Sequence, residues 1–373
     1  MDNVTHAALG IAAGIVVRRR GASLPAAALA GLLAAEAPDL DVFIRSAGDP
    51  LVSFRWHRHF THSFAFMPVW ALLSAWLTTW IFCWQRQPIT NAAIAKKSAL
   101  LNRIGEWLSS WCFRRRPDAD WKGLLLPGLA GALTHLLCDG CTSYGTMLLW
   151  PFAETRYAWD CLPIIDLFAT LPVLVLAILA WRKAAPRLAL YGLLWFTSYA
   201  LLGVWQHARA ETALRRWFAS QQVTRRTERL AVKPTALNLL VWRCVWLEDG
   251  RWHTAAVRVA PFAEPRIIVG ETRAALSPAS PGLPAAGSPG AVIIADFSRF
   301  TQGWNSFTAD GGAVLIGDIR FGMLPTSARP LWSVRCEPAA PSTVIMDRSL
   351  RPGDWGRFGQ MIVGNHPDFV TLK

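Results

Sequence analysis

The residues of this chain that are best suited to chemistry are histidines and aspartates near its start. Five of the eight histidines fall within the first 140 residues, and aspartates lie between them beside apolar stretches. Imidazole nitrogens and carboxylate oxygens at such spacings are typical ligands of a divalent metal ion. Because polar groups near lipid are costly to keep, the pattern indicates a function. The residues concerned are His6, Asp39, Asp41, His57, His59, His62, His135 and Asp139.

The spacing within this set predicts how its members meet. His135 and Asp139 are four residues apart, so on a helix both side chains point from one face and can serve one metal ion or two neighbouring ions. His57, His59 and His62 crowd one short segment, in which His59 and His62 face together if it is helical. Taken singly, each residue is more often an ordinary polar residue. Together these five histidines and three aspartates indicate a metal site, because they are predicted to lie on one face of the membrane.

Two aspartates and an arginine add to this chemistry. Asp39 and Asp41 follow Pro38 and alternate in an extended turn, so we expect one to face the metal while the other orients a ligand imidazole. The set can hold one to three divalent ions, with zinc or manganese as the first expectation. With an open coordination position, such an ion lowers the pKa of bound water towards about 7. Arg58 is a candidate clamp for phosphate or carboxylate, because guanidinium offers bidentate donors.

The composition indicates a membrane protein with an attached soluble part. Of the 373 residues, 53% are apolar and 17% are charged. Residues 64–84 carry no charge over a length that can cross a bilayer, which takes roughly 20 residues. Three other stretches are similar, and two shorter ones are candidates for a buried or re-entrant hairpin. We predict an all-α polytopic membrane bundle of about four to six membrane helices or half-helices, at residues 4–17, 24–37, 64–84, 123–138, 162–181 and 188–205.

The formal net charge of +13 is concentrated in short clusters beside apolar stretches, at residues 18–20, 114–116 and 182–187. Under the positive-inside bias these clusters, with the whole 85–122 loop, mark the cytoplasmic face, which puts the histidines and aspartates together on the opposite face. Membrane lipids are the expected partners, and no specific nucleic acid is expected. The basic run at 209–233 leaves an acidic partner or a lipid surface open. Nothing in the pattern sets the oligomeric state.

From about residue 234 the pattern changes to extended segments. Residues 239–247 and 252–259 flank Asp249-Gly250, a strong hairpin signal, and 291–297 and 313–321 are predicted as two more strands. We therefore predict three parts. They are a membrane helical domain at 1–207 that carries the metal site, a basic connecting segment at 208–233, and a small β-rich domain at 234–373 that lies in the periplasm.

The same residues resemble the pattern of the YdjM-like family of bacterial inner-membrane proteins, which are classed as membrane-bound metal-dependent hydrolases. The resemblance covers about residues 1–205 and implies a multi-pass protein of the inner (plasma) membrane. It does not extend to the β-rich part. The matching pieces are Thr5-His6 with Gly10, Pro38-Asp39-Leu40-Asp41, His57-Arg58, Thr61-His62-Ser63, and His135 with Asp139, Thr142, Gly145 and Thr146.

The family's pattern is in turn similar to the metal-binding pattern of zinc-dependent phospholipase C enzymes, which implies hydrolysis of a phosphoester. His59 stands where the family pattern leads us to expect a small residue. Asp41, Arg58 and His59 are the expected catalytic residues, Asp41 being also a further candidate ligand. Carried over residue by residue, the likeness implies metal ligands at His6, Asp39, His57, His62, His135 and Asp139.

We therefore expect a membrane-bound metal-dependent hydrolase in which activated water attacks a phosphoester or other ester, with a lipid or lipid-linked substrate. An aspartate of the 39/41 pair serves as general base if it is not a ligand. The alternative is a non-enzymatic scaffold or sensor whose metal only ties helices together. A metal transporter would need ligands near the bilayer midplane, and residues 64–84 and 188–205 show no polar continuation of that kind.

Overall fold

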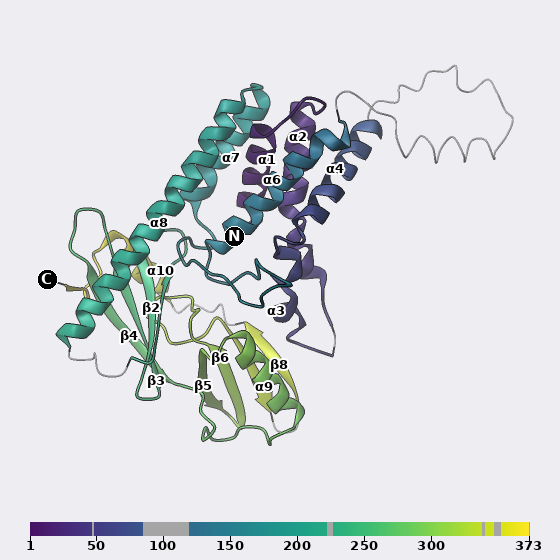
Figure 1. The fold of residues 1–373 in the computed structure, drawn as a ribbon. Helices are drawn as coiled ribbons and strands as arrows, with labels where there is room; N and C mark the ends of the chain where they lie inside the picture. Colours follow the sequence, from purple (N-terminus) through teal and green to yellow (C-terminus); the bar gives the residue numbers. More distant parts are fainter. Residues whose placement is uncertain (47, 85–118, 222–226, 338–339, 347–351, 373) are drawn as a thin grey trace, which may run out of the picture.

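The computed structural model describes residues 1–46, 48–84, 119–221, 227–337, 340–346 and 352–372. In Figure 1 its first part is a bundle of helices that lie side by side above a β-rich part. Most of the predicted cytoplasmic loop at 85–122, with its cluster at 114–116, lies outside the described residues. The main helices are α1 (Asn3–Val16), α2 (Leu24–Glu36), α4 (Met67–Trp84), α6 (Trp121–Gly140), α7 (Leu167–Arg182) and α8 (Pro186–Ser220).

Capping residues decide where several of these helices begin. The Asp2 side chain accepts a hydrogen bond from the third residue of α1, and Ser23 does the same for α2. Asp166 caps α7 by accepting from two backbone amides, and Tyr199 of α8 donates a hydrogen bond of 2.8 Å to its other oxygen. The helix predicted at 162–181 therefore begins only after Asp166.

Glycines let three helices approach closely. A Cβ atom added at Gly131 of α6 would lie 2.1 Å from the carbonyl oxygen of Gly31 in α2, and one at Gly31 would lie 2.2 Å from that of Gly10 in α1. Small residues at helix crossings are the usual way for apolar helices to pack in a membrane. This packing holds the carboxyl end of α6 beside the amino end of α1 and the carboxyl end of α2.

The number of helices that can span a membrane is lower than predicted. Among the described residues, α6 and α8 are long and apolar enough to cross a bilayer, and a third span results if residues 52–62 and 67–82, which meet at 80°, count as one broken span. Helices α1, α2 and α7 have 14, 13 and 16 residues, short of the roughly 20 that a span needs. The predicted runs at 64–84 and 162–181 are longer than the helices α4 and α7 that they form, and Asp166 caps α7 inside the second run.

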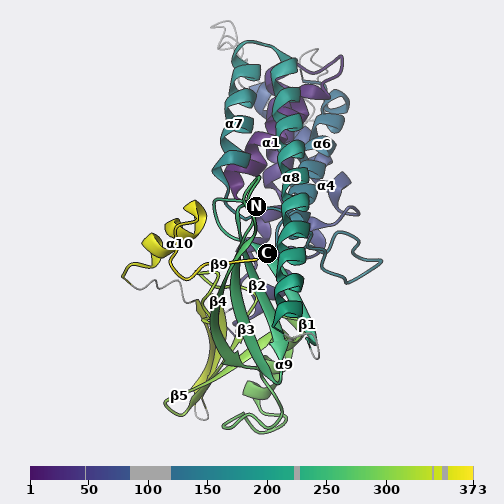
Figure 2. The same cartoon turned by 90° about the vertical axis from the view of Figure 1, so that its left-hand side faces the viewer.

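The remaining chain forms two antiparallel sheets, as the predicted β-rich part requires. The first has the strand order β1-β2-β3-β4-β9 and the second the order β5-β6-β7-β8. Figure 2 shows the lower half of α8 running along the first sheet, where Phe218 and Trp246 have ring centroids 5.2 Å apart. The strands are β1 (Arg229–Pro234), β2 (Val241–Glu248), β3 (Arg251–Arg258), β4 (Arg266–Ala274), β5 (Asn305–Asp310), β6 (Ala313–Asp318), β7 (Trp332–Glu337), β8 (Ala340–Met346) and β9 (Val370–Thr371).

Local predictions in this part had different outcomes. The hairpin at Asp249-Gly250 is confirmed, because both residues have positive φ and join β2 to β3. The strand predicted at 291–297 is wrong, since these residues lie in helix α9 (Pro289–Phe300), which Ser288 caps. The first part of the predicted connecting segment, up to Ser220, continues α8 as a helix.

The β-rich part also contacts the short helix before α4, and a buried arginine joins its own segments. Phe54 of the short helix α3 (Val52–Trp56) packs against Phe297, with ring centroids 6.4 Å apart. Arg243 of β2 is buried and donates to five backbone carbonyls between residues 319 and 327, which ties the first sheet to the segment after β6. A last helix, α10 (Asp354–Val363), precedes β9.

Candidate metal centre

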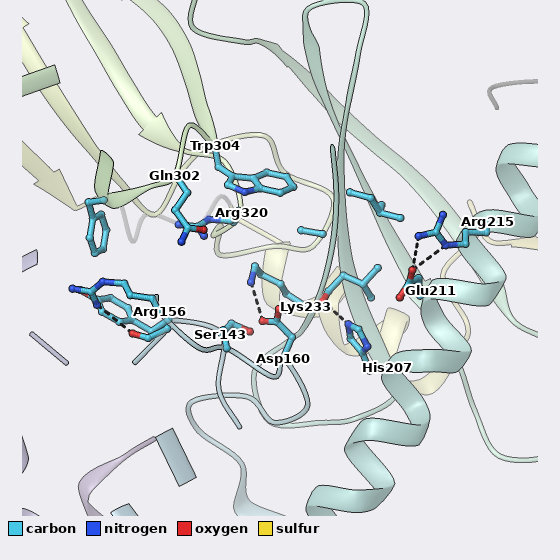
Figure 3. A pocket seen from close by; sticks show the side chains of 17 residues that line it. Ser143, Arg156, Asp160, His207, Glu211, Arg215, Lys233, Gln302, Trp304 and Arg320 are labelled. Atoms are coloured by element: carbon cyan, nitrogen blue, oxygen red, sulfur yellow. Dashed lines mark hydrogen bonds and ion pairs between the residues drawn. The ribbon is translucent and has the colours of Figure 1, made fainter. Parts of the chain in front are cut away.

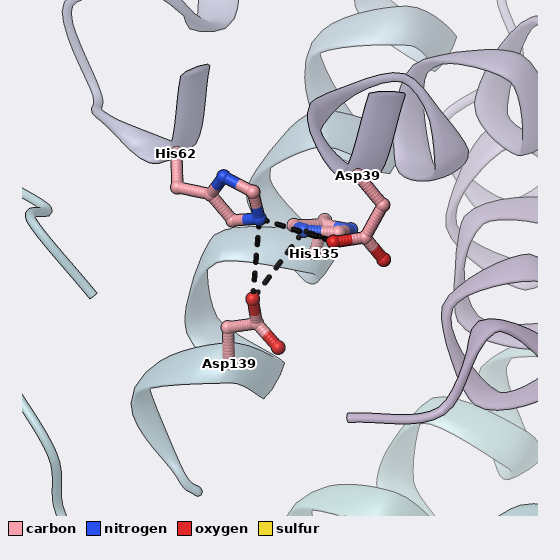
Figure 4. Close-up of side chains that lie close together, drawn as sticks. All are labelled: Asp39, His62, His135 and Asp139. Carbon is pink, nitrogen blue, oxygen red and sulfur yellow. Dashed lines mark hydrogen bonds and ion pairs between the residues drawn. The ribbon is translucent and has the colours of Figure 1, made fainter. Parts of the chain in front are cut away.

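Four side chains meet at the end of the bundle that faces the β-rich part (Figure 4). Asp39, His62, His135 and Asp139 each offer one ligand atom, and these atoms lie within 4.8 Å of one another. His62 Nε2 is 3.2 Å from Asp39 Oδ1 and 3.4 Å from Asp139 Oδ2. His135 Nε2 is 3.5 Å from Asp139 Oδ2. We call these four residues the inner group.

Three segments supply the inner group. His135 and Asp139 are one turn apart near the end of α6, as their spacing predicted. Asp39 comes from a 3-10 helix, η1 (Pro38–Phe43), which follows α2. His62 ends a second 3-10 helix, η2 (Phe60–His62), just before the chain turns into α4. Residues distant in the sequence thus meet because helix packing brings their elements together.

Hydrogen bonds behind the two histidines turn their Nε2 atoms towards the centre. His135 Nδ1 lies 2.5 Å from the carbonyl oxygen of Ala35. Because a carbonyl only accepts, Nδ1 donates the proton and Nε2 of the neutral ring keeps its lone pair. His62 Nδ1 lies 3.3 Å from Asp41 Oδ2 and 3.0 Å from Thr61 Oγ1. Metal-binding histidines have such a partner on the second nitrogen.

Buried polar atoms without partners indicate that the site fits a metal ion. Among the described residues, His135 Nε2, Asp139 Oδ2 and both ring nitrogens of His6 have no hydrogen-bond partner. His6 reaches the site from α1, with its Nε2 3.3 Å from Asp139 Oδ1. Unpaired buried polar atoms cost free energy, and converging nitrogen and oxygen lone pairs are what a divalent ion satisfies. The donors do not identify the metal.

Asp39 also belongs to a second group, with Asp41 and His57. His57 Nδ1 is 2.8 Å from Asp41 Oδ1, while Asp41 Oδ2 accepts from the Arg58 amide at 2.9 Å and from Thr61 Oγ1 at 3.1 Å. Burial alone would raise the pKa of Asp41, but the hydrogen bonds from His57 and His62 hold that pKa well below its ordinary value. A carboxylate engaged in this way is a poor proton acceptor, so the geometry favours an orienting role for Asp41.

Arg58 contacts the inner group through Asp139. Its Nη2 lies 2.9 Å from Asp139 Oδ1, and its Nη1 donates to Thr142 Oγ1 at 2.8 Å. The amino group of Met1 contacts the same oxygen of Asp139. Because Arg58 engages Oδ1 and Oδ2 has no hydrogen-bond partner among the described residues, Oδ2 is the oxygen that Asp139 leaves for a metal ion.

His59 belongs to neither group of ligands. Its ring centroid lies 5.0 Å from that of Trp56 and 6.0 Å from that of Trp150. Its surroundings are therefore aromatic, and we assign it no step.

The sequence analysis missed Tyr144, which forms a wall of the site. Its ring centroid lies 5.2 Å from the ring of His57 and 5.2 Å from the guanidinium carbon of Arg58. The only sequence signal was its position between Thr142 and Gly145, two residues of the family pattern.

A helical bundle with a buried cluster of histidines and aspartates, followed by two antiparallel sheets, defines a membrane protein with a candidate metal site. The model of the family described as YdjM inner membrane protein matches residues 1–210. The chain therefore belongs to this family, which confirms the resemblance. No curated protein and no solved structure matches the chain.

Proposed function

We propose that this protein is a membrane-bound metal-dependent hydrolase that cleaves a phosphoester or other ester of a lipid or lipid-linked molecule. The observation that carries the proposal is that Asp39 belongs to both ligand groups. One carboxylate shared by two neighbouring sets of ligands suits two-metal hydrolytic sites, whose ions lie roughly 3.5–4 Å apart. Zinc or manganese matches this mixture of imidazole and carboxylate donors.

The chain's own residues would have separate roles in this reaction. A bound divalent ion supplies activated water and polarises the ester oxygen. His62, His135 and Asp139 hold the inner position, His57 holds the outer one, and Asp39 reaches both. Asp41 keeps His57 and His62 in the required orientation through the hydrogen bonds described above.

The exposure of the ligands favours one direction of approach for the substrate. The His57 and Asp39 side chains are 26% and 16% exposed, whereas those of His62, His135 and Asp139 are fully buried. A substrate therefore approaches from the side of His57. Arg58 lies next to that side, and its guanidinium can donate to a phosphate oxygen.

We also propose that the ligand end faces the periplasm, in a multi-pass arrangement with the β-rich part on the same side. The support is the charge distribution. The basic residues at 18–20 and 182–187 lie in the turns α1–α2 and α7–α8, at the bundle end away from the β-rich part (Figure 1). Under the positive-inside bias that end is cytoplasmic.

A second candidate is a membrane scaffold or sensor in which the metal is structural. The observation that favours it is the complete burial of His6, His62, His135 and Asp139. A closed site with four ligands and no open position is typical of structural metal ions.

Hydrolysis by the purified protein decides between the two. We expect zinc- or manganese-loaded protein to hydrolyse at least one of four classes: phosphomonoesters, phosphodiesters, carboxylic esters or phospholipids. Activity should disappear after chelation, return with metal, and be absent from the His62→Ala, His135→Ala double variant. Arg187→Gln, at the far end of α8, serves as the control that keeps activity. Stoichiometric metal without turnover of any class would favour the scaffold, and absence of metal would exclude both proposals.

A further inference from the structure

A cavity of about 330 Å³ lies between the bundle and the β-rich part (Figure 3). Small-molecule pockets commonly measure roughly 300 to 1,000 Å³. Its walls come from the loop after α6, from α8 with β1, and from residues between α9 and β7. None of the described residues that line it is a candidate metal ligand. The cavity is therefore separate from the metal centre.

Cationic side chains outnumber carboxylates in the lining. Lys233 Nζ lies 2.8 Å from Asp160 Oδ1, and Arg215 forms an ion pair with Glu211. Arg320 forms an ion pair with Asp318, at 2.7 Å. The cationic residues of the lining are Arg156, Arg215, Lys233 and Arg320, and its carboxylates are Asp160 and Glu211.

Among the cationic residues of the lining, Arg156 is the one whose charge is not neutralised by an ion pair with a described carboxylate. Its guanidinium is half-buried and donates, at 3.1 to 3.3 Å, to the backbone carbonyls of residues 54, 55, 57 and 145. No carboxylate forms an ion pair with it in the part of the chain that the structure describes. The carbonyl groups accept hydrogen bonds from its N–H groups but do not neutralise its charge. At reduced dielectric that charge stabilises a nearby anion.

A buried hydroxyl in the same wall also lacks a partner. Ser143 is 8% exposed, and its Oγ has no hydrogen-bond partner among the described residues. In Figure 3, Ser143 and Arg156 lie on one wall, Gln302, Trp304 and Arg320 lie across the cavity from them, and Lys233 lies between. Donors thus surround the space from several directions.

We propose that this cavity binds the phosphate group of a phosphoester. A tetrahedral anion accepts hydrogen bonds from several directions at once, which matches donors on facing walls better than a planar carboxylate does. A lipid headgroup and a soluble phosphoester present the same chemistry to these residues.

The position of the cavity makes it a second site, next to the proposed active site. Tyr144 lines the cavity and also contacts His57, so one side chain separates the two. The lining residues from Leu230 onwards lie beyond the family match, which ends at residue 210. The β-rich part therefore contributes residues to this cavity from outside the matched range.

Calorimetric titration of metal-free protein in detergent isolates this site from the metal centre. The two probes are glycerol phosphate and short-chain phosphatidic acid. We expect one site per chain, with affinity reduced roughly five- to tenfold in Ser143→Ala, the loss expected for one hydrogen bond. Ser143→Ala removes no hydrogen bond of the protein itself, so its folding is preserved. Lys233→Gln should weaken binding at least as much, because it removes a positive charge and frees Asp160.

Arg187→Gln removes an equal charge from the far end of α8 and should bind like the unmodified protein. Tighter binding of phosphatidic acid would identify a lipid headgroup as the ligand, and equal binding a soluble phosphoester; both support the proposal. Binding that requires added metal, or that Ser143→Ala and Lys233→Gln leave unchanged, would overturn it. Neither of those results would bear on hydrolysis at the metal centre.

Discussion

The imidazole rings of His6 and His135 are stacked, with centroids 3.9 Å apart and an angle of 24° between their planes. The pair joins the start of α1 to the end of α6 inside a fully buried cluster. Two buried histidines that share one cluster with Asp139 have few ways to be satisfied by protein groups alone. The stacking therefore places His6 beside the candidate metal centre.

The shared position of Asp39 predicts how metal content responds to single substitutions. Asp39→Ala should reduce the metal content at both positions, His135→Ala at the inner position, and His57→Ala at the outer one only. Elemental analysis of the purified variants measures this, with Arg187→Gln as the control. Equal metal in Asp39→Ala and unmodified protein would contradict a shared carboxylate.

The orienting role of Asp41 predicts a loss of affinity without a loss of fold. Asp41→Asn keeps the size of the side chain but replaces one acceptor oxygen by a donor, so it can no longer hold both His57 and His62. We expect metal affinity to fall by roughly 10- to 100-fold, the usual effect of removing a partner behind a ligand. Competition with a chromophoric chelator measures it. An unchanged affinity would show that the two imidazoles are oriented by other contacts.

Close helix packing predicts that a single methyl group destabilises the bundle. In Gly131→Ala the new Cβ would lie 2.1 Å from the carbonyl oxygen of Gly31, so α2 and α6 must separate. Overpacking of this kind costs roughly 1–3 kcal/mol, and the thermal midpoint in detergent should fall. Gly48→Ala is the matched control, because no atom lies within 4 Å of its Cβ. Equal midpoints for both variants would refute the close crossing.

The buried guanidinium of Arg243 predicts a large effect in the β-rich part. Arg243→Met leaves several buried carbonyls without a donor, each costing roughly 1–3 kcal/mol. We expect rapid proteolysis after residue 227, while the bundle stays resistant. Arg251→Met, on the same sheet but exposed, is the control. Proteolysis at the same rate in both variants would argue against this role.

The proposed orientation predicts opposite labelling of two exposed positions. A cysteine at Ala279 in the β-rich part should react with a membrane-impermeant thiol reagent in spheroplasts, whereas a cysteine at Arg187 in the α7–α8 turn should react only after lysis. The unsubstituted chain gives the background. Labelling of position 187 in intact spheroplasts would reverse the orientation.

Much of the site's chemistry can be predicted from the sequence because it depends on neighbouring residues. The i, i+4 spacing of His135 and Asp139 needs only a helix to put both on one face. The Asp249-Gly250 turn needs only two residues that tolerate positive φ. The same reasoning overestimated the number of spans. The run at 162–181, for example, does not show that Asp166 caps α7, so that the helix begins only after it. It also missed α9, whose capping residue Ser288 lies inside a stretch rich in loop-forming residues.

The sequence by itself indicated the candidate ligands, and all of them lie within residues 1–210, which the family model matches. Only the tertiary structure decided that Asp39 serves two ligand groups, that the Ala35 carbonyl orients His135, and that Arg156 and Ser143 line a cavity with Trp304. The physical reason is distance along the chain. These contacts join segments that meet only when glycine-lined helices pack together and the β-rich part docks against α3 and α8, and no local pattern encodes that meeting.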